Sequence, residues 1–216
     1  GKTTLFNLIA GNLKTTNGNV FFNNENITNV PSYQLFSKGL LRTFQIAHEF
    51  TNLTVLENLM MVPGNQSGEK LMTALLKPKL VKKEEETVKQ KAYEVIDFLN
   101  LKHLSNELAG NLSGGQKKLL ELGRTMMVDA KIVLLDEVGA GVNRTLLKDI
   151  GTAIQRLNEE KGYTFCMIEH DMDFIKRMCD PVIVMAEGSV LFEGTPEEVM
   201  KNEKVIESYL GRAKTK

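Results

Sequence analysis

The 216-residue sequence has no tryptophan, only two cysteines and no formal net charge, because 27 basic side chains balance 27 acidic ones. Balanced charge argues against a general nucleic-acid binder, which usually carries a basic excess. Two cysteines do not make a disulfide framework, so we expect Cys166 and Cys179 to be reduced thiols in the core of an intracellular protein. No uncharged apolar run reaches about 18 residues, so we expect any action at a membrane to require a partner that spans it.

The composition fits a globular α/β protein with a sizeable core. Hydrophobic residues make up 42% of the chain, enough for one large domain or for a core with a small subdomain. Predicted strands and helices alternate in the second half, which is typical of a largely parallel sheet with helices on both faces. One predicted strand ends at Asp136, and three others cover residues 164–168, 182–185 and 189–193. The predicted helices cover residues 145–160 and 171–178.

One pentapeptide has the features of a phosphate-binding helix start. Leu112-Ser113-Gly114-Gly115-Gln116 places backbone amides and a serine hydroxyl at the beginning of a helix, and an apolar stripe predicts that this helix continues through residue 127. The first amides of a helix have no intrahelical partners and suit a bound anion. Taken alone, these five residues also arise by chance in loops.

About one helix and one strand later, an apolar run ends in two acidic residues. The run from Ile132 to Leu135 predicts a strand buried on both faces, and Asp136 and Glu137 close it. A buried carboxylate needs a cation or hydrogen-bond donors to offset its desolvation, so Asp136 is a candidate Mg²⁺ ligand. Glu137 points the other way and could activate a water molecule. Read alone, adjacent acids at a strand end are also common in surface loops.

The first residues read as the second half of a phosphate-binding loop. Gly1-Lys2-Thr3-Thr4 matches the end of the pattern G-x-x-x-x-G-K-[ST], followed by an amphipathic helix. In that motif the lysine reaches the β- and γ-phosphates and the next hydroxyl binds Mg²⁺. We expect the chain to be truncated within this loop and to lack the preceding strands and their adenine-stacking aromatic residue. As given, it should bind nucleotide poorly and should not hydrolyse it measurably.

The LSGGQ pentapeptide followed at this spacing by IVLLDE resembles the ATP-binding cassette (ABC) family, and the resemblance extends from Gly1 to about Gly211. It implies a P-loop NTPase core with a mainly parallel sheet, an antiparallel β element and a helical subdomain. It also implies an ATPase that uses ATP and Mg²⁺. The residues implied to bind ATP are Gly1, Lys2, Thr3 and Thr4 of one subunit and Ser113, Gly114, Gly115 and Gln116 of a second.

The resemblance also assigns catalytic and metal-binding roles. Glu137 matches the general base, and His170 matches the switch histidine that hydrogen-bonds the γ-phosphate. Gln45 matches the glutamine that reaches Mg²⁺ and the attacking water, and together with Thr3 and Asp136 it completes the implied metal ligands. Without the resemblance, Gln45 is an ordinary polar residue at a strand end, and a lone histidine is more often structural.

The chain departs from the family pattern after the catalytic glutamate. Residues 140–143 occupy the place of the D-loop, which lies between two ATPase subunits in the family. Val138 stands where most members have proline, and Arg144 replaces a proline common after this loop. We expect a less rigid backbone here.

Residues from about 50 to 111 predict a helical insertion within an ABC ATPase domain that covers residues 1–216. Thr54-Val55-Leu56-Glu57 reads as a capping box that starts a helix. A longer helix is predicted over residues 82–100, with an apolar face that begins at Val88 and charges elsewhere. The insertion has the size of the helical subdomain in transport ATPases and is too short for the coiled-coil arms of DNA-repair members.

The closing segment, residues 193–199 and 205–211, and the motif IEHDMDFI most resemble the ATPases of branched-chain amino-acid importers. The resemblance implies a homodimer or heterodimer at the cytoplasmic face of the membrane, bound to permease subunits near residues 45–53 and the helical subdomain. A solute-binding protein is expected in the full system, and nucleic acid is not. The alternatives are a urea importer or an exporter, a non-transport ABC protein acting on nucleic acid or ribosomes, and a nucleotide-binding regulator without turnover. The sequence does not identify the transported solute.

Overall fold

A three-stranded parallel sheet forms the centre of the computed structural model, which describes residues 1–43, 49–64, 66–69, 71–128 and 130–210. The strands lie in the order β3 (Leu40–Arg42), β4 (Ile132–Asp136) and β5 (Thr164–Ile168). Residues 133 to 136 of β4 are buried, as expected of a central parallel strand covered on both faces. The predicted parallel α/β core is therefore confirmed, and β5 has the predicted bounds.

The first face of this sheet packs against the N-terminal part of the chain. That part comprises α1 (Lys2–Ile9), the short antiparallel pair β1 (Phe21–Phe22) and β2 (Glu25–Asn26), and α2 (Ser32–Ser37). Phe6 of α1 and Leu35 of α2 are buried against Leu40, Leu134 and Ile168, one side chain from each central strand. Because strand side chains alternate between faces, Arg42 and Asp136 lie on this same face of the sheet.

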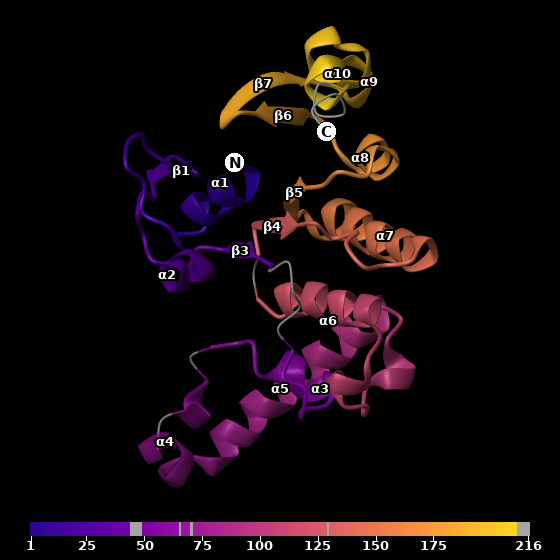
Figure 1. Cartoon of the computed structure of the whole chain (residues 1–216). Helices are drawn as coiled ribbons and strands as arrows, with labels where there is room; N and C mark the ends of the chain where they lie inside the picture. Colours follow the sequence, from indigo (N-terminus) through magenta and orange to yellow (C-terminus); the bar gives the residue numbers. More distant parts are fainter. Residues whose placement is uncertain (44–48, 65, 70, 129, 211–216) are drawn as a thin grey trace.

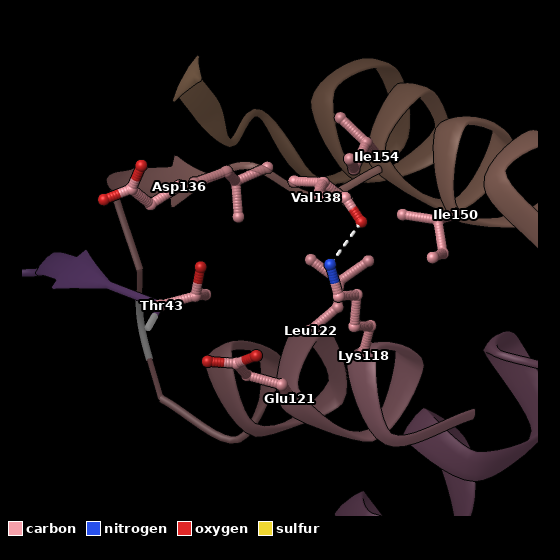
Figure 2. Close-up of a pocket in the computed structure, with 9 residues that line it drawn as sticks. Thr43, Lys118, Glu121, Leu122, Asp136, Val138, Ile150 and Ile154 are labelled. Carbon is pink, nitrogen blue, oxygen red and sulfur yellow. Dashed lines mark hydrogen bonds between the residues drawn. The ribbon is translucent and has the colours of Figure 1, made fainter. Parts of the chain in front are cut away.

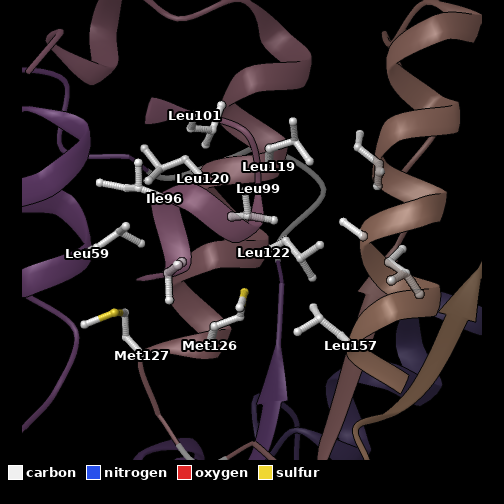
Figure 3. Packing of buried hydrophobic residues seen from close by; sticks show 14 of the residues in the cluster. Leu59, Ile96, Leu99, Leu101, Leu119, Leu120, Leu122, Met126, Met127 and Leu157 are labelled. Carbon is white, nitrogen blue, oxygen red and sulfur yellow. The ribbon is translucent and has the colours of Figure 1, made fainter. Parts of the chain in front are cut away.

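The second face packs against α6 (Gly114–Met126) and α7 (Arg144–Lys161), and through them against residues 50–111. The helices between 50 and 111 are α3 (Val55–Met60), the 3₁₀ helix η1 (Ser67–Glu69), α4 (Leu71–Leu76), α5 (Pro78–Phe98), and the 3₁₀ helices η2 (Lys102–Leu104) and η3 (Ala109–Asn111). Figure 3 shows the shared core, in which Leu59, Ile96 and Leu99 lie beside leucines and methionines of α6. The predicted capping box of α3 is present, with both Thr54–Glu57 hydrogen bonds.

The C-terminal part forms a separate layer. It comprises α8 (Met172–Met178), the antiparallel pair β6 (Val182–Ala186) and β7 (Ser189–Gly194), α9 (Pro196–Lys201) and α10 (Glu203–Leu210). Figure 1 shows this pair with α9 and α10 at one end of the molecule and α3, α4 and α5 at the other. The three-stranded sheet lies between these two ends.

Two expectations from the sequence need correction. Helix α5 begins at Pro78 rather than at residue 82, because proline is well suited to the first helical position, where its missing N–H would have no partner anyway. Cys166 lies on a strand but is exposed, and Cys179 is partly buried, so the free thiols are not a pair of core cysteines. Among the described residues, no helix is long and apolar enough to cross a bilayer.

Candidate functional site

The first turn of α1 presents backbone donors at the surface. Gly1, Lys2, Thr3 and Thr4 are exposed, and the helix start has no side-chain cap. Burial of Phe6 against the sheet fixes the direction of the helix. A β-carbon built on Gly1 would lie 3.4 Å from the Cα of Gly188, so this helix start lies beside the β6–β7 turn. Uncapped amides, the positive end of the helix dipole and a nearby lysine together make a suitable phosphate site.

Asp136 is tied to α1 by a buried arginine that the sequence analysis did not assign to the site. Arg42 Nη2 donates to Asp136 Oδ2 at 3.0 Å, and Arg42 Nη1 donates to Asn7 Oδ1 of α1. The expectation that the buried carboxylate would need a cation is therefore met within the chain by Arg42. The signal in the sequence was an arginine directly after the apolar pair Leu40-Leu41, since a charge that becomes buried needs a partner.

Glu137 leaves the strand in an unusual backbone conformation. Its φ is +51°, in the left-handed region that side chains other than glycine, asparagine and aspartate seldom adopt. Its N–H donates to the carbonyl of Ile168 at 2.9 Å, which ties it to the end of β5. On the other side, Lys118 Nζ of α6 donates to the carbonyls of Glu137 at 3.0 Å and Val138 at 2.6 Å. The backbone of Glu137 is therefore held between β5 and α6.

The end of β5 brings two more ionisable residues to the same edge of the sheet. Glu169 is buried, and its carboxylate accepts from the N–H of Gly139 at 2.7 Å and from the N–H of His170 at 3.3 Å. His170 itself is exposed. The sequence analysis did not identify Glu169 as a residue that holds the loop after Glu137; the visible signal was an acid at the end of a predicted buried strand.

The pentapeptide 112–116 forms the start of α6, against the start of α7. Ser113 is the N-cap: its hydroxyl accepts from the N–H of Gln116, and the Gln116 side chain accepts from the N–H of Ser113 at 2.9 Å. A β-carbon built on Gly115 would lie 1.8 Å from Leu146 Cδ2, so only glycine fits there. Gly114 lies nearest the carbonyl of Gly141, in the predicted D-loop. Asn143 ends that loop and caps α7 by accepting from the N–H of Leu146.

A small cavity lies between α6, the end of β4 and α7, and Figure 2 shows its lining. Its polar side chains are those of Thr43, Lys118, Glu121 and Asp136, and its apolar walls include Val138. The cavity volume is about 20 Å³, which is space for about one water molecule. A nucleotide is far larger, so this cavity is part of the support behind the acidic residues and is not the nucleotide site.

The donor set suits Mg²⁺ better than a transition metal. Within the described part of the chain, no group of three or more histidine, cysteine, aspartate and glutamate side chains is arranged to hold a metal ion. Mg²⁺ needs only one or two carboxylates, because it keeps waters and binds phosphate oxygens. Asp136 and the exposed hydroxyl of Thr3 are oxygen donors of the required kind. The third expected ligand, Gln45, lies outside the described residues.

The predicted site residues therefore fall into three places. Asp136, Glu137 and His170 lie together at the carboxyl edge of the sheet. Residues 1–4 begin the helix that Arg42 links to Asp136. Residues 113–116 lie with α7, next to Gly141 and Leu146.

Comparisons with known proteins agree with this arrangement. Residues 1–140 match the family described as ABC transporter, and residues 189–215 match the family described as branched-chain amino acid ATP-binding cassette transporter. A probable branched-chain amino acid transport ATP-binding protein, LivG, from Archaeoglobus fulgidus is 42% identical over 213 residues, which are 98% of this chain and 80% of the relative. The high-affinity LivG protein of Escherichia coli is 33% identical over 99% of this chain and 84% of its own length.

Solved structures give the same result. The crystal structure of an ATP-binding cassette of an ABC transporter in its ADP conformation superposes with a TM-score of 0.80 at 40% identity, covering 98% of this chain and 84% of that one. CbiO1 of an ABC transporter complex from Clostridium perfringens superposes with a TM-score of 0.78 at 26% identity, covering 98% of this chain and 79% of that one.

Proposed function

This chain belongs to the ABC transporter family as an ATP-binding subunit, and we propose that it hydrolyses ATP to drive the import of branched-chain amino acids. The observation that carries the proposal is the acidic pair at the end of the central strand. Asp136 is buried beside the helix whose first turn suits phosphate, and Glu137 is held at the same edge of the sheet. A metal-binding carboxylate next to a general base is an arrangement that can catalyse phosphate hydrolysis.

The nucleotide site follows from the first turn of α1. In the proposal, the amides of residues 1–4 hold the phosphates, Lys2 neutralises the β- and γ-phosphates, and Thr3, Asp136 and Gln45 hold Mg²⁺. When bound, Mg²⁺ neutralises the charge that develops on the phosphate oxygens. Arg42 binds one carboxylate oxygen of Asp136 and so orients that side chain.

Glu137 is proposed as the general base for the attacking water. Its carboxylate would accept a proton from the water as the oxygen approaches the γ-phosphorus. His170, exposed at the same edge, would donate a hydrogen bond to the γ-phosphate, and Gln45 would orient the water. General-base help of this kind contributes typically about 10²–10⁴-fold to the rate.

The second half of the nucleotide site is proposed to come from another ATPase subunit. Ser113 to Gln116 begin α6 beside α7, whereas residues 1–4 begin α1 beside Gly188. Both segments are exposed except for Gly115, which packs on Leu146, and Gln116, which is partly buried. In a dimer the amides and hydroxyl of Ser113 and Gly114 would contact the γ-phosphate bound to the partner, so that closure depends on ATP.

Residues 50–111 are proposed as the helical subdomain that binds the permease at the cytoplasmic face of the membrane. Its surface carries exposed apolar side chains, and contiguous patches of this kind often mark interaction sites. The exposed apolar residues of this region include Phe50, Met61, Met72, Leu75 and Leu76. The buried amide of Asn58 holds the loop that leads into this region by donating to the carbonyls of residues 50, 53 and 54.

The solute assignment comes from the names of the relatives and from the match of residues 189–215. The solute is bound by other subunits, namely the permease and a solute-binding protein, so no residue of this chain selects it. The test is reconstitution in proteoliposomes with permease subunits of a branched-chain amino-acid importer and with a solute-binding protein. ATP inside the vesicles should drive uptake of labelled leucine, isoleucine or valine. Uptake of urea alone would contradict the solute assignment, and absence of any ATP hydrolysis would contradict the activity.

A further inference from the structure

We propose that Lys118 is a positioning residue for ATP hydrolysis, because its ammonium group holds the backbone that carries Glu137. This inference rests on the proposed role of Glu137 as general base. Lys118 Nζ donates to the two carbonyl groups that follow the strand, those of Glu137 and Val138.

The contact is close and comes from a distant part of the chain. Lys118 belongs to α6, 19 and 20 residues before its two acceptors, and its Nζ lies 3.0 Å from the carbonyl oxygen of Glu137 and 2.6 Å from that of Val138. Figure 2 shows the ammonium group reaching from α6 to the carbonyl of Val138. Hydrogen bonds from a charged donor are shorter and about twice as strong as neutral ones, so this pair can fix a peptide orientation.

The peptide orientation matters because Glu137 is strained. A non-glycine residue at φ +51° is strained and persists only where surrounding contacts hold it. The N–H of Glu137 is bound to Ile168, and its carbonyl is bound to Lys118 and to the N–H of Ala140. Without Lys118, the carbonyl of Glu137 loses its charged hydrogen-bond donor. The peptide can then change its orientation, and the direction of the Glu137 side chain is less well defined.

Burial and nearby acids act on the Lys118 ammonium in opposite directions. Burial is the stronger influence and lowers the pKa of Lys118 below its ordinary value, and the carboxylates of Glu169, Glu121 and Glu137 offset part of that shift. The charge of this half-buried ammonium is compensated by the three acids and by the two carbonyl oxygens that it binds. Since Glu169 also accepts from the N–H of Gly139, Lys118 and Glu169 hold successive parts of the same loop.

The consequence for the reaction is a link inside one subunit. Lys118 lies two residues after Gln116, in the helix whose start is proposed to contact the partner's nucleotide. A displacement of α6 would therefore be transmitted to the peptide of the general base. Small displacements of a catalytic group have large effects: a misplacement of about 1 Å can reduce the rate of the chemical step about 10²-fold.

The test compares Lys118→Met, Lys118→Arg and the control Lys148→Met in the purified full-length protein, with a complete phosphate-binding loop. Lys148 is an exposed lysine of α7. Lys118→Met should lower kcat about 10²-fold while KM for ATP and ATP affinity stay within about 3-fold, because the residue does not bind nucleotide. Lys118→Arg, which can donate to both carbonyls, should recover most of kcat, and Lys148→Met should match the wild type. A kcat within about 3-fold of wild type for Lys118→Met would overturn the inference.

A double-mutant comparison separates positioning from general destabilisation. If Lys118 acts through Glu137, adding Lys118→Met to Glu137→Gln should leave the residual turnover unchanged, because the group being positioned has already been replaced. A further 10-fold loss in the double variant would overturn the inference. If Lys118→Met does not fold, Lys118→Gln, which keeps one donor, replaces it in both comparisons with the same criteria. Normal turnover of Glu137→Gln would instead overturn the proposed base itself.

Discussion

Arg42 and Asp136 form a buried ion pair, with 3.0 Å between Nη2 and Oδ2 and side chains that are 8% and 2% exposed. The same guanidinium donates to Asn7 of α1, so one side chain joins the helix of the phosphate site to the end of the central strand. A planar guanidinium suits this role because it can donate in two fixed directions at once. The proposed Mg²⁺ site has one part at the start of α1 and the other at Asp136, and their relative placement therefore depends on Arg42 of β3.

Replacing Arg42 with methionine should destabilise the protein strongly. The substitution leaves Asp136 buried without its counter-charge, and breaking a buried ion pair by removing one partner typically costs about 3–5 kcal/mol. The free energy of unfolding, measured by urea denaturation without nucleotide or Mg²⁺, should fall by that amount. The control is Lys38→Met, which removes a more exposed ion pair with Glu25 and should cost at most about 1 kcal/mol. Equal losses for the two variants would contradict the structural importance of Arg42.

Gly115 tests whether the pentapeptide has a packing role besides its proposed contact with phosphate. Gly115→Ala places a methyl group against Leu146 and should lower the free energy of unfolding by about 1–3 kcal/mol through overpacking. Gly114→Ala, whose β-carbon would have no neighbour closer than 3.9 Å, is the matched control and should be milder. In a Leu146→Ala background, Gly115→Ala should lower the free energy of unfolding by less, because the side chain that its methyl group would meet has been removed. If Gly114→Ala and Gly115→Ala were equally destabilising, the predicted packing would be wrong.

The capping box of α3 predicts a pH dependence. The backbone N–H and the hydroxyl of Thr54 donate to Glu57 and lower the pKa of its carboxyl group. Because the pKa is lower in the folded chain than in the unfolded one, this contribution to stability is complete above the unfolded pKa and is lost as the pH falls through the folded pKa. Carboxyl-resolved NMR should show Glu57 titrating at lower pH than a glutamate in a flexible peptide. Thr54→Ala should move its pKa upward, and an unchanged pKa in that variant would argue against the hydroxyl contact.

The motifs that could be predicted from sequence are those with local causes. The capping box at Thr54 needs only residues three apart, and it is present. The apolar run before Asp136 predicts a buried strand, because a central parallel strand is apolar on both faces. The predicted start of α5 lies beyond the observed start at Pro78, because the apolar face on which the prediction rests begins at Val88, after the first turns of the helix.

The contacts that sequence reasoning missed are long-range. Arg42 faces Asp136 only because β3 pairs with β4 in a register that places Arg42 beside Leu134, and 94 residues separate the two charged groups. The role of Lys118 depends on where α6 crosses the end of β4. Neither position follows from spacing or periodicity, which report on one element at a time. An arginine within an apolar strand and a lysine on a buried helix were visible in the sequence, but their partners were not.

The central claim is that Glu137 is the base of an ATPase, and Glu137→Gln tests it most directly. The substitution keeps the shape of the side chain and removes the base, so steady-state ATP turnover should fall by about 10²–10⁴-fold. ATP affinity should stay within a few-fold, and the control Glu86→Gln, at an exposed position of α5, should turn over ATP like the wild type. Turnover by Glu137→Gln within a few-fold of the wild-type rate would contradict the account.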